Sequence, residues 1–160
     1  MRNERIRHAR GRRQNEGNKG NSGDLKNRLE AAALFASDGD APNDDLFDGI
    51  ARAFAAKIRE QGLKDNTQMR RWFNAVDELN SKAMQGILTD NHIRAEMALL
   101  RARIAFAQKR PGVKVPQALV DFITVASKKV GNPQELRVFR CMFECVVAYH
   151  RAGVSMEANE

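Results

Sequence analysis

Apolar residues recur three and four positions apart along most of this chain, and that spacing constrains its fold more than any other feature. The stretch 66–80, NTQMRRWFNAVDELN, is the clearest case. Here Met69, Trp72, Phe73, Val76 and Leu79 would share one face of a helix. No segment shows the strict alternation of a strand. The sequence therefore predicts an all-α fold, a compact bundle of five to six helices.

Capping residues, glycines and prolines divide the chain into helical segments. We expect helices at about 24–36, 46–62, 66–86, 90–110, 117–131 and 133–153. Asp24 is the expected cap of the first, and Asn66 or Thr67 that of the third. The segment 90–110 carries a second apolar face, Leu99, Ala102 and Phe106, which predicts a central helix. The last segment has two apolar lines, so we expect it to be buried on two sides.

The 160 residues carry a net charge of +7, and this charge is unevenly distributed. Residues 1–20 hold seven Lys or Arg against two acids, whereas residues 21–48 hold two bases against seven acids. Residues 49–160 carry a net +7 of their own, with 18 bases and 11 acids. The sequence predicts a disordered basic tail over 1–23 and one helical domain over 24–160. A basic surface favours phosphate-rich partners such as nucleic acid.

The absence of membrane and export signals predicts a cytoplasmic protein. No run of about 18 apolar residues could span a bilayer. The basic N-terminus lacks the apolar stretch of a secretory signal. Cys141 and Cys145 lie four apart in a predicted helix, where their side chains run nearly parallel and do not favour a disulfide. We interpret them as reduced packing residues.

Motifs for catalysis, metal binding or a cofactor are missing from the sequence. His8, His92 and His150 form no pair at the spacing of a helical metal site. Phosphate-binding and dinucleotide-binding glycine motifs are absent as well. The sequence predicts a protein that is not an enzyme and has no catalytic residues, metal or cofactor.

Basic residues form a more coherent pattern. Lys64, Gln68 and Arg71 share one helix face, with Arg70 beside them, at a helix N-terminus that favours anions. Glu144 is placed to pair with Arg140 and neutralise it. The full set of candidate RNA-binding residues is Lys64, Gln68, Arg70, Arg71, Arg101, Arg103, Lys109, Arg110, Arg137 and Arg151.

Three stretches, QMRRWFNAVDEL, LLRARIAFAQKR and FECVVAYHRAG, resemble in this order the small subunit of the Csm complex, the type III-A CRISPR effector. The resemblance covers residues 46–153. Ala102, Arg103 and Phe106 depart from the usual family residues, and the loop GLKDNTQ is one residue longer than is typical. The resemblance places the family's C-terminal signature over Tyr149 and His150. We interpret Tyr149 as a core residue and His150 as a helix-end cap.

The resemblance also implies a function. Small subunits of this family are not nucleases; several copies stack along the guide RNA and the target RNA paired to it. The implied partners are guide RNA, target RNA or possibly single-stranded DNA, other Csm subunits and copies of the chain itself, acting in antiviral and anti-plasmid defence. Sequence-independent backbone contacts would suffice, because guide pairing supplies specificity.

Two other classes of function stay open at this point. One is a helix-turn-helix regulator of duplex DNA, although Trp72 and Phe73 would occupy the face that a recognition helix needs. The other is a helical adaptor that binds no nucleic acid. Strong sequence preference in binding to DNA duplexes would indicate the regulator. If the protein shows no salt-dependent binding to RNA, the adaptor is indicated.

Overall fold

The computed structural model describes residues 20–153 as six α-helices and one 3₁₀ turn. The elements are α1 (Gly20–Ala31), η1 (Asp44–Leu46), α2 (Gly49–Glu60), α3 (Thr67–Met84), α4 (Asp90–Lys109), α5 (Gln117–Lys128) and α6 (Pro133–Ala152). In this range the only extended pairing is an isolated bridge between Phe35 and Pro42. The predicted all-α bundle is confirmed.

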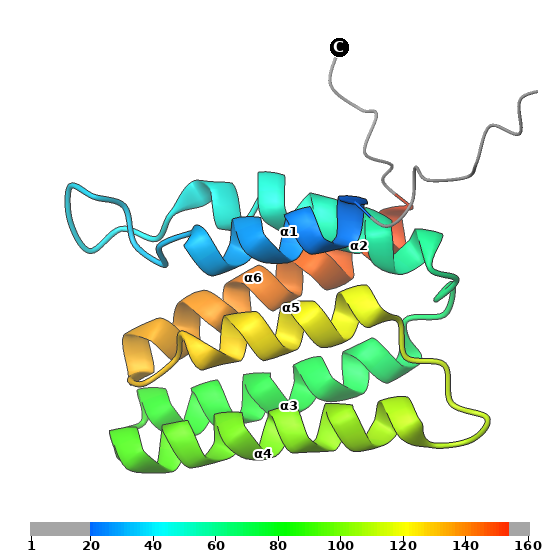
Figure 1. The fold of residues 1–160 in the computed structure, drawn as a ribbon. Helices are drawn as coiled ribbons and strands as arrows, with labels where there is room; N and C mark the ends of the chain where they lie inside the picture. The colour runs from blue at the N-terminus through cyan, green and yellow to red at the C-terminus, as the bar shows by residue number, and fades with distance from the viewer. Residues whose placement is uncertain (1–19, 154–160) are drawn as a thin grey trace, which may run out of the picture.

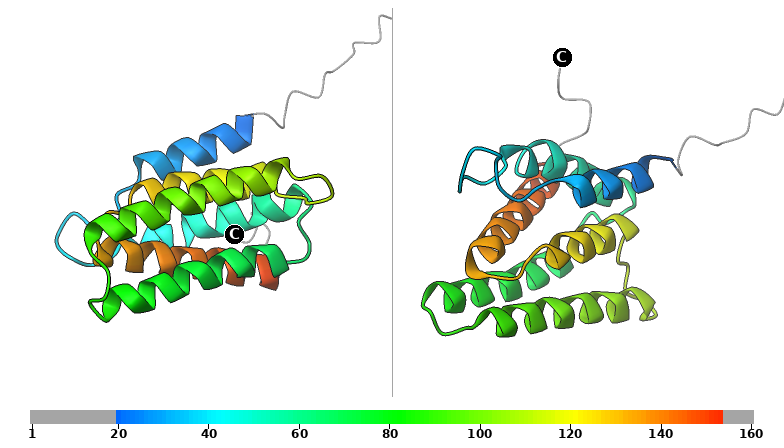
Figure 2. Two further views of the ribbon diagram at one scale, coloured as in Figure 1. Left: turned by 90° about the horizontal axis from the view of Figure 1, so that it is seen from below. Right: turned by 60° about the vertical axis from the view of Figure 1, so that its left-hand side comes forward.

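The helices lie in three layers (Figure 1), with α1 and α2 in one, α5 and α6 in the middle, and α3 and α4 in the third. Helix α6 packs on α2 from one side and on α3 from the other. Helix α5 contacts α1, α2 and α4. The right-hand view of Figure 2 shows the same arrangement, with α4 at the edge farthest from the α1–α2 layer. Helices α5 and α6 therefore connect the two outer layers.

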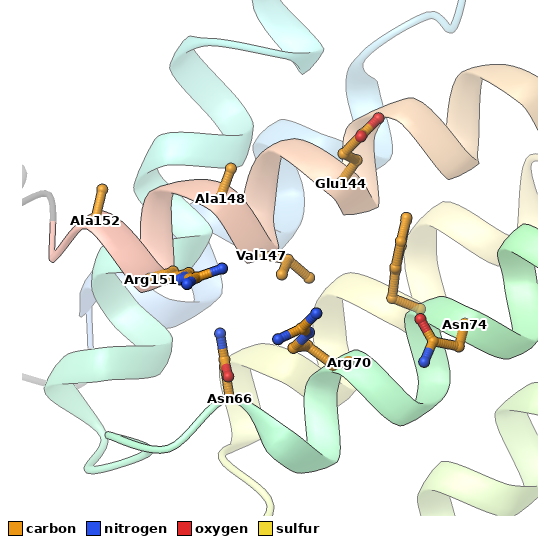
Figure 3. A pocket seen from close by; sticks show the side chains of 9 residues that line it. Asn66, Arg70, Asn74, Glu144, Val147, Ala148, Arg151 and Ala152 are labelled. Atoms are coloured by element: carbon orange, nitrogen blue, oxygen red, sulfur yellow. The ribbon is translucent and has the colours of Figure 1, made fainter.

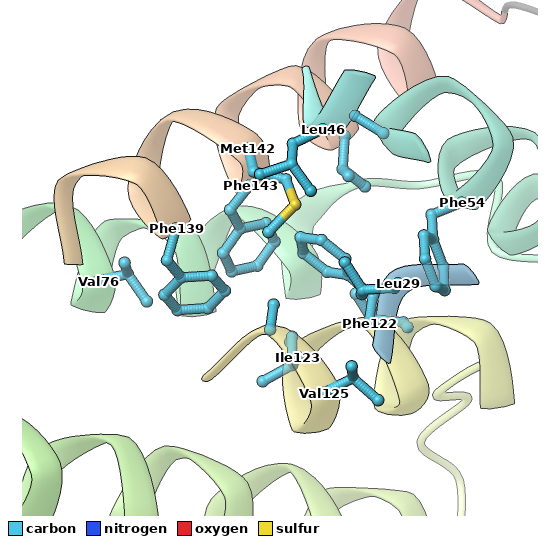
Figure 4. Close-up of a cluster of buried hydrophobic side chains, with 14 of the residues drawn as sticks. Leu29, Leu46, Phe54, Val76, Phe122, Ile123, Val125, Phe139, Met142 and Phe143 are labelled. Carbon is cyan, nitrogen blue, oxygen red and sulfur yellow. The ribbon is translucent and has the colours of Figure 1, made fainter. Parts of the chain in front are cut away.

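Aromatic rings from α2, α5 and α6 fill the centre of the bundle (Figure 4). The ring centroid of Phe122 lies 5.4 Å from the ring centroids of Phe54 and Phe143. The ring centroid of Phe139 lies 6.0 Å from that of Phe143. All four side chains are buried. Tilted, edge-on and stacked ring pairs at such distances stabilise a core beyond the burial of their area.

Most residues of the apolar lines expected on α3 and α6 are buried. On α6, Leu136, Phe139, Phe143 and Val146 are buried, as are Val138 and Met142 of the second line. On α3, Met69, Trp72 and Val76 are buried, whereas Phe73 and Leu79 are half-buried. The prediction that the last helix is buried on two sides is confirmed.

The prediction that helix 90–110 is central is wrong. Helix α4 buries one face, containing Ile93, Met97, Leu100 and Ile104. The second apolar face remains in solvent, with Leu99 45% and Phe106 69% exposed. The core is already filled by rings from α5 and α6, so α4 covers it from one side only.

Two helix starts differ from expectation. Helix α1 begins at Gly20, four residues before Asp24. Residues 1–19, where most of the predicted tail falls, lie outside the described residues. At α3, neither Asn66 nor Thr67 supplies the expected side-chain cap. Instead, Asp65 Oδ1 accepts hydrogen bonds from the hydroxyl and the N–H of Thr67 at 2.7 and 3.0 Å, and these bonds lower the pKa of Asp65.

The interpretation of His150 as a helix-end cap is also wrong. Its buried ring lies with Nε2 2.5 Å from the carbonyl oxygen of Leu63. A carbonyl can only accept, so Nε2 carries the proton in this contact. Gly153, with φ +69°, ends α6 in the left-handed conformation and donates to the His150 carbonyl. His150 thus fixes the end of α6 to the loop that leads into α3.

Replacing Trp72 with Ala should lower the free energy of unfolding by about 3–5 kcal/mol, because the substitution opens a cavity between α3 and the core. Denaturant unfolding followed by circular dichroism measures the change. Asn27→Ala on the exposed face of α1 is the control and should stay within about 0.5 kcal/mol of the parent. A similar loss for both variants would contradict the assignment of Trp72 to the core.

His150→Leu should lower the free energy of unfolding by about 1–3 kcal/mol, since the Leu63 carbonyl loses its buried donor. Leucine keeps most of the apolar volume, so a cavity contributes little. The same unfolding experiment reports the result. An unchanged midpoint would mean that water or another donor replaces the imidazole.

Candidate nucleic-acid interface

A groove of about 580 Å³ runs between the first turns of α3 and the last turns of α6. Figure 3 shows Arg70 of α3 and Arg151 of α6 pointing towards the space between the two helices. A second hollow of about 390 Å³ adjoins it, sharing Asn66, Arg70 and Asn74 and adding Thr67 and Arg71. We call this combined surface the α3–α6 groove. Its lining residues are Asn66, Thr67, Arg70, Arg71, Phe73, Asn74, Glu144, Val147, Ala148, Arg151 and Ala152.

The spacing of residues on α3 explains why polar groups gather here. Asn66, Arg70 and Asn74 follow one another at intervals of four, so they form one stripe on the helix. Met69 and Trp72 anchor the opposite face in the core. On α6, Val147 and Ala148 contribute apolar lining, and Arg151 completes the rim one turn later.

Three arginines at the α3–α6 groove carry uncompensated charge. Within residues 20–153, the guanidinium groups of Arg70, Arg71 and Arg151 make no hydrogen bond or ion pair. All three residues are exposed. Arg70 and Arg71 lie near the N-terminus of α3, whose helix dipole adds partial positive charge. The groove therefore favours an anion.

Arg140 provides the contrast. Its guanidinium donates to Asp77 of α3 at 2.7 Å and to Glu144 at 2.5 Å, and it lies 5.4 Å from the ring centroid of Phe73. The hydrogen bond with Asp77, followed by the charge of Glu144, raises the pKa of Arg140. The predicted pairing with Glu144 is confirmed. This arginine joins α6 to α3, and its charge is balanced.

The structure brings together only part of the predicted RNA-binding set. Arg70, Arg71 and Arg151 meet at the groove, with Lys64 and Gln68 nearby on the same loop and helix. Arg137 lies 14 residues before Arg151 on α6, a distance of about 21 Å along the axis.

The remaining candidates lie on α4 and at its end. Arg103, Lys109 and Arg110 are exposed there, at the outer edge of the bundle. Arg101 is half-buried and donates to Ser127 Oγ at 3.1 Å, which gives it a packing role. RNA contacts by these four residues stay predictions.

Sequence reasoning missed the carboxamides and the apolar lining of the groove. Asn66 and Asn74 could have been found, because each lies four residues from Arg70. The sequence pattern predicts Phe73 in the core, yet this residue is half-buried and lines the groove, while its ring packs edge-on against Phe143 at 5.8 Å. Val147 and Ala148 join the site only through the packing of α6 on α3, which no local pattern reveals.

The groove has the chemistry of a binding surface. Guanidinium and carboxamide groups bind phosphate and sugar oxygens, and the apolar lining can cover the less polar parts of a nucleotide. Among residues 20–153, no cluster of three metal-ligating side chains occurs. Within the same range, none of the helices combines the length and apolar character needed to cross a membrane.

A comparison with protein families finds one match. The model of the Csm2 Type III-A family aligns with residues 41–155, which include helices α2–α6 and the entire α3–α6 groove. Searches of curated proteins and of solved structures give no match. The family match covers well over half of the chain and agrees with the resemblance in the sequence. The chain therefore belongs to the Csm2 Type III-A family, the small subunit of the type III-A CRISPR effector complex.

Proposed function

We propose that this chain is a non-catalytic, sequence-independent RNA-binding subunit, and that it contacts the guide RNA–target RNA duplex through the α3–α6 groove. The observation that carries the proposal is the meeting of Arg70, Arg71 and Arg151, all without partners among the described residues, at one groove. Family membership supports the setting, a type III-A effector complex.

Arginine suits this role because its planar guanidinium can form two parallel hydrogen bonds with a phosphate. Two arginines from α3 and one from α6 would bind phosphates on either side of the groove. Asn66 and Asn74 would add neutral donors and acceptors for sugar oxygens. Contacts of this kind position a nucleic acid without reading its sequence.

The complex would supply what the chain lacks. Pairing between guide and target provides sequence specificity, so the small subunit needs only charge and shape. Copies of the chain would repeat along the duplex, beside other Csm subunits, as part of defence against viruses and plasmids. Catalytic steps would belong to those other subunits.

The alternative functions have less support. A helix-turn-helix regulator would need an exposed recognition helix, but α3 packs its Met69 and Trp72 face into the core and α6 covers its side. An adaptor without nucleic acid would leave the three unpaired arginines of the groove without a role.

The double variant Arg70→Ala/Arg71→Ala should bind RNA more weakly by about 1–3 kcal/mol, similarly for unrelated sequences, because charged hydrogen bonds to phosphate are lost. Its stability should change by less than about 0.5 kcal/mol, since both side chains are exposed and alanine favours a helix. Fluorescence anisotropy with two unrelated RNA oligonucleotides and a thermal melt provide the two measurements.

Lys114→Ala/Lys128→Ala is a matched control, because it removes the same charge from exposed residues that do not line the groove. Parent and both variants retain the basic residues 1–20, so binding by that segment affects all three equally. An equal loss in the control would indicate a general charge effect. Parent-like binding by the Arg70/Arg71 variant would reject the groove.

Salt dependence should report the number of phosphates contacted. On single-stranded RNA, the logarithm of the affinity should fall with the logarithm of salt concentration by roughly 0.7 per neutralised phosphate. The Arg70/Arg71 variant should lower this slope by about 1.4, corresponding to two lost contacts. The same slope in parent and variant would show that these arginines do not displace counterions from the RNA.

A further inference from the structure

The α3–α6 groove has an apolar centre, which contacts with a phosphate backbone do not require. Phe73 of α3 and Val147 and Ala148 of α6 line it, and its volume of about 580 Å³ falls within the roughly 300–1,000 Å³ typical of small-molecule sites. Phosphates bind to guanidinium and amide groups. The apolar lining therefore favours a second chemical group in the same ligand, one with apolar surface to bury.

The Phe73 ring is held in place by neighbouring side chains. It packs edge-on against Phe143, with ring centroids 5.8 Å apart, and the guanidinium carbon of Arg140 lies 5.4 Å from the Phe73 centroid. Arg140 is itself fixed by ion pairs with Asp77 and Glu144. Phe73 is half-buried, so part of its ring remains available to a ligand. A wall that is already ordered costs little conformational entropy on binding.

Charge differs between the two ends of the groove. Arg151 and Asn66 lie at one end, and Glu144 and Asn74 lie at the other, with Arg70 between them on α3 (Figure 3). This order follows from the helices, since Glu144 precedes Arg151 by seven residues, about 10 Å along α6. A carboxylate has no proton to donate to a phosphate. An anionic group would therefore occupy the arginine end.

A single nucleotide has the two groups that this arrangement requires. Its phosphate would bind between Arg70 and Arg151, whose guanidinium groups make no hydrogen bond or ion pair within residues 20–153. Its base would lie against the apolar centre, where the base edge can exchange hydrogen bonds with Asn74 and Glu144. A base combines an apolar face with a polar edge, and the lining of the groove matches both.

We infer that the α3–α6 groove is a pocket for one unstacked nucleotide, with the phosphate between Arg70 and Arg151 and the base against Phe73, Val147 and Ala148. The inference rests on the proposed function and deepens it, because it names the part of the RNA that the groove takes. Bases inside a continuous duplex are paired and stacked, so only an unstacked base can enter the groove. A free nucleoside monophosphate offers the same chemistry, and the experiments separate these two sources.

The first experiment uses the full chain and two small ligands, adenosine monophosphate and ribose phosphate, which share the phosphate and differ in the base. Ligand-observed NMR titrations measure both affinities. Adenosine monophosphate should bind about tenfold more tightly, because its base gains contacts with the apolar lining. Saturation transferred from the protein should reach the protons of the base. Phosphate binding by the basic residues 1–20 counts equally for both ligands.

The second experiment asks whether the nucleotide belongs to RNA. Fluorescence anisotropy compares three hairpins of one sequence: a continuous duplex, the same duplex with a single-nucleotide bulge, and the same bulge without its base. The complete bulge should bind about tenfold more tightly than the other two, since it alone offers an unpaired base. A preference for the base among the small ligands alone would identify a free nucleotide as the ligand. No preference in either experiment would overturn the inference.

Ala148→Leu tests where the base lies. Ala148 is exposed and lines the groove, so a larger side chain fills space there and leaves the arginines in place. This variant should lose the preference for the base and keep the affinity of the parent for ribose phosphate. Ala31→Leu, at an exposed position outside the groove, adds the same volume and should bind as the parent does. A preference for the base that survives in Ala148→Leu would reject the pocket.

The inference and the proposed function fail in different ways. Suppose that Arg70→Ala/Arg71→Ala weakens the binding of all three hairpins, while the parent binds these hairpins equally and shows no preference between the small ligands. The groove then binds backbone alone, so the proposed function stands and the pocket is rejected. If the same variant binds every hairpin as the parent does, the proposed function itself fails.

Discussion

Helix α6 is packed between α2 and α3, and the position of every functional group depends on this packing. Its two apolar lines bury Phe139 and Phe143 against the Phe122 ring of α5, and Met142 within the same core. Arg140 then ties α6 to Asp77 of α3, while His150 ties its last turn to the Leu63 carbonyl. The α3–α6 groove lies between these two contacts and is lined by residues within 66–74 and 144–152. A binding surface is thus held by residues that do not themselves face its ligand.

Most of the fold could be predicted from the sequence, because helical periodicity is a local property. The stripes on α3 and α6 identified most of the buried residues of these helices, and the glycines and prolines placed the boundaries within a few residues. The prediction failed for one face of α4, because an apolar pattern on a helix does not reveal whether another part of the chain packs against it. Leu99 and Phe106 have the spacing of core residues, yet α4 lies at an edge and leaves them in solvent. His150 has the position of a cap, but its role depends on a carbonyl 87 residues away.

The candidate site could be predicted only in part, for the same reason. Arg70 and Arg71 stand out on one helix, and Asn66 and Asn74 belong to the same local stripe. Their association with Arg151 comes from tertiary packing across some eighty residues of sequence, so no single-sequence pattern contains it. The sequence also does not show which arginines have their charge paired in the folded protein. Arg140, Arg101 and Arg71 look alike in the sequence, but the first is paired, the second is bonded to Ser127, and the third is free of side-chain partners among the described residues.

The one-sided packing of α4 has a consequence for motion. A helix supported by neighbours on a single face opens at a lower free energy than the bundle as a whole unfolds. Its backbone amides should then exchange with solvent deuterium faster than those of α5 and α6, whose buried faces are more extensive. Any neighbour that covers Leu99 and Phe106 would slow that exchange without altering the fold. The free and the assembled subunit would therefore share one structure but differ in local rigidity.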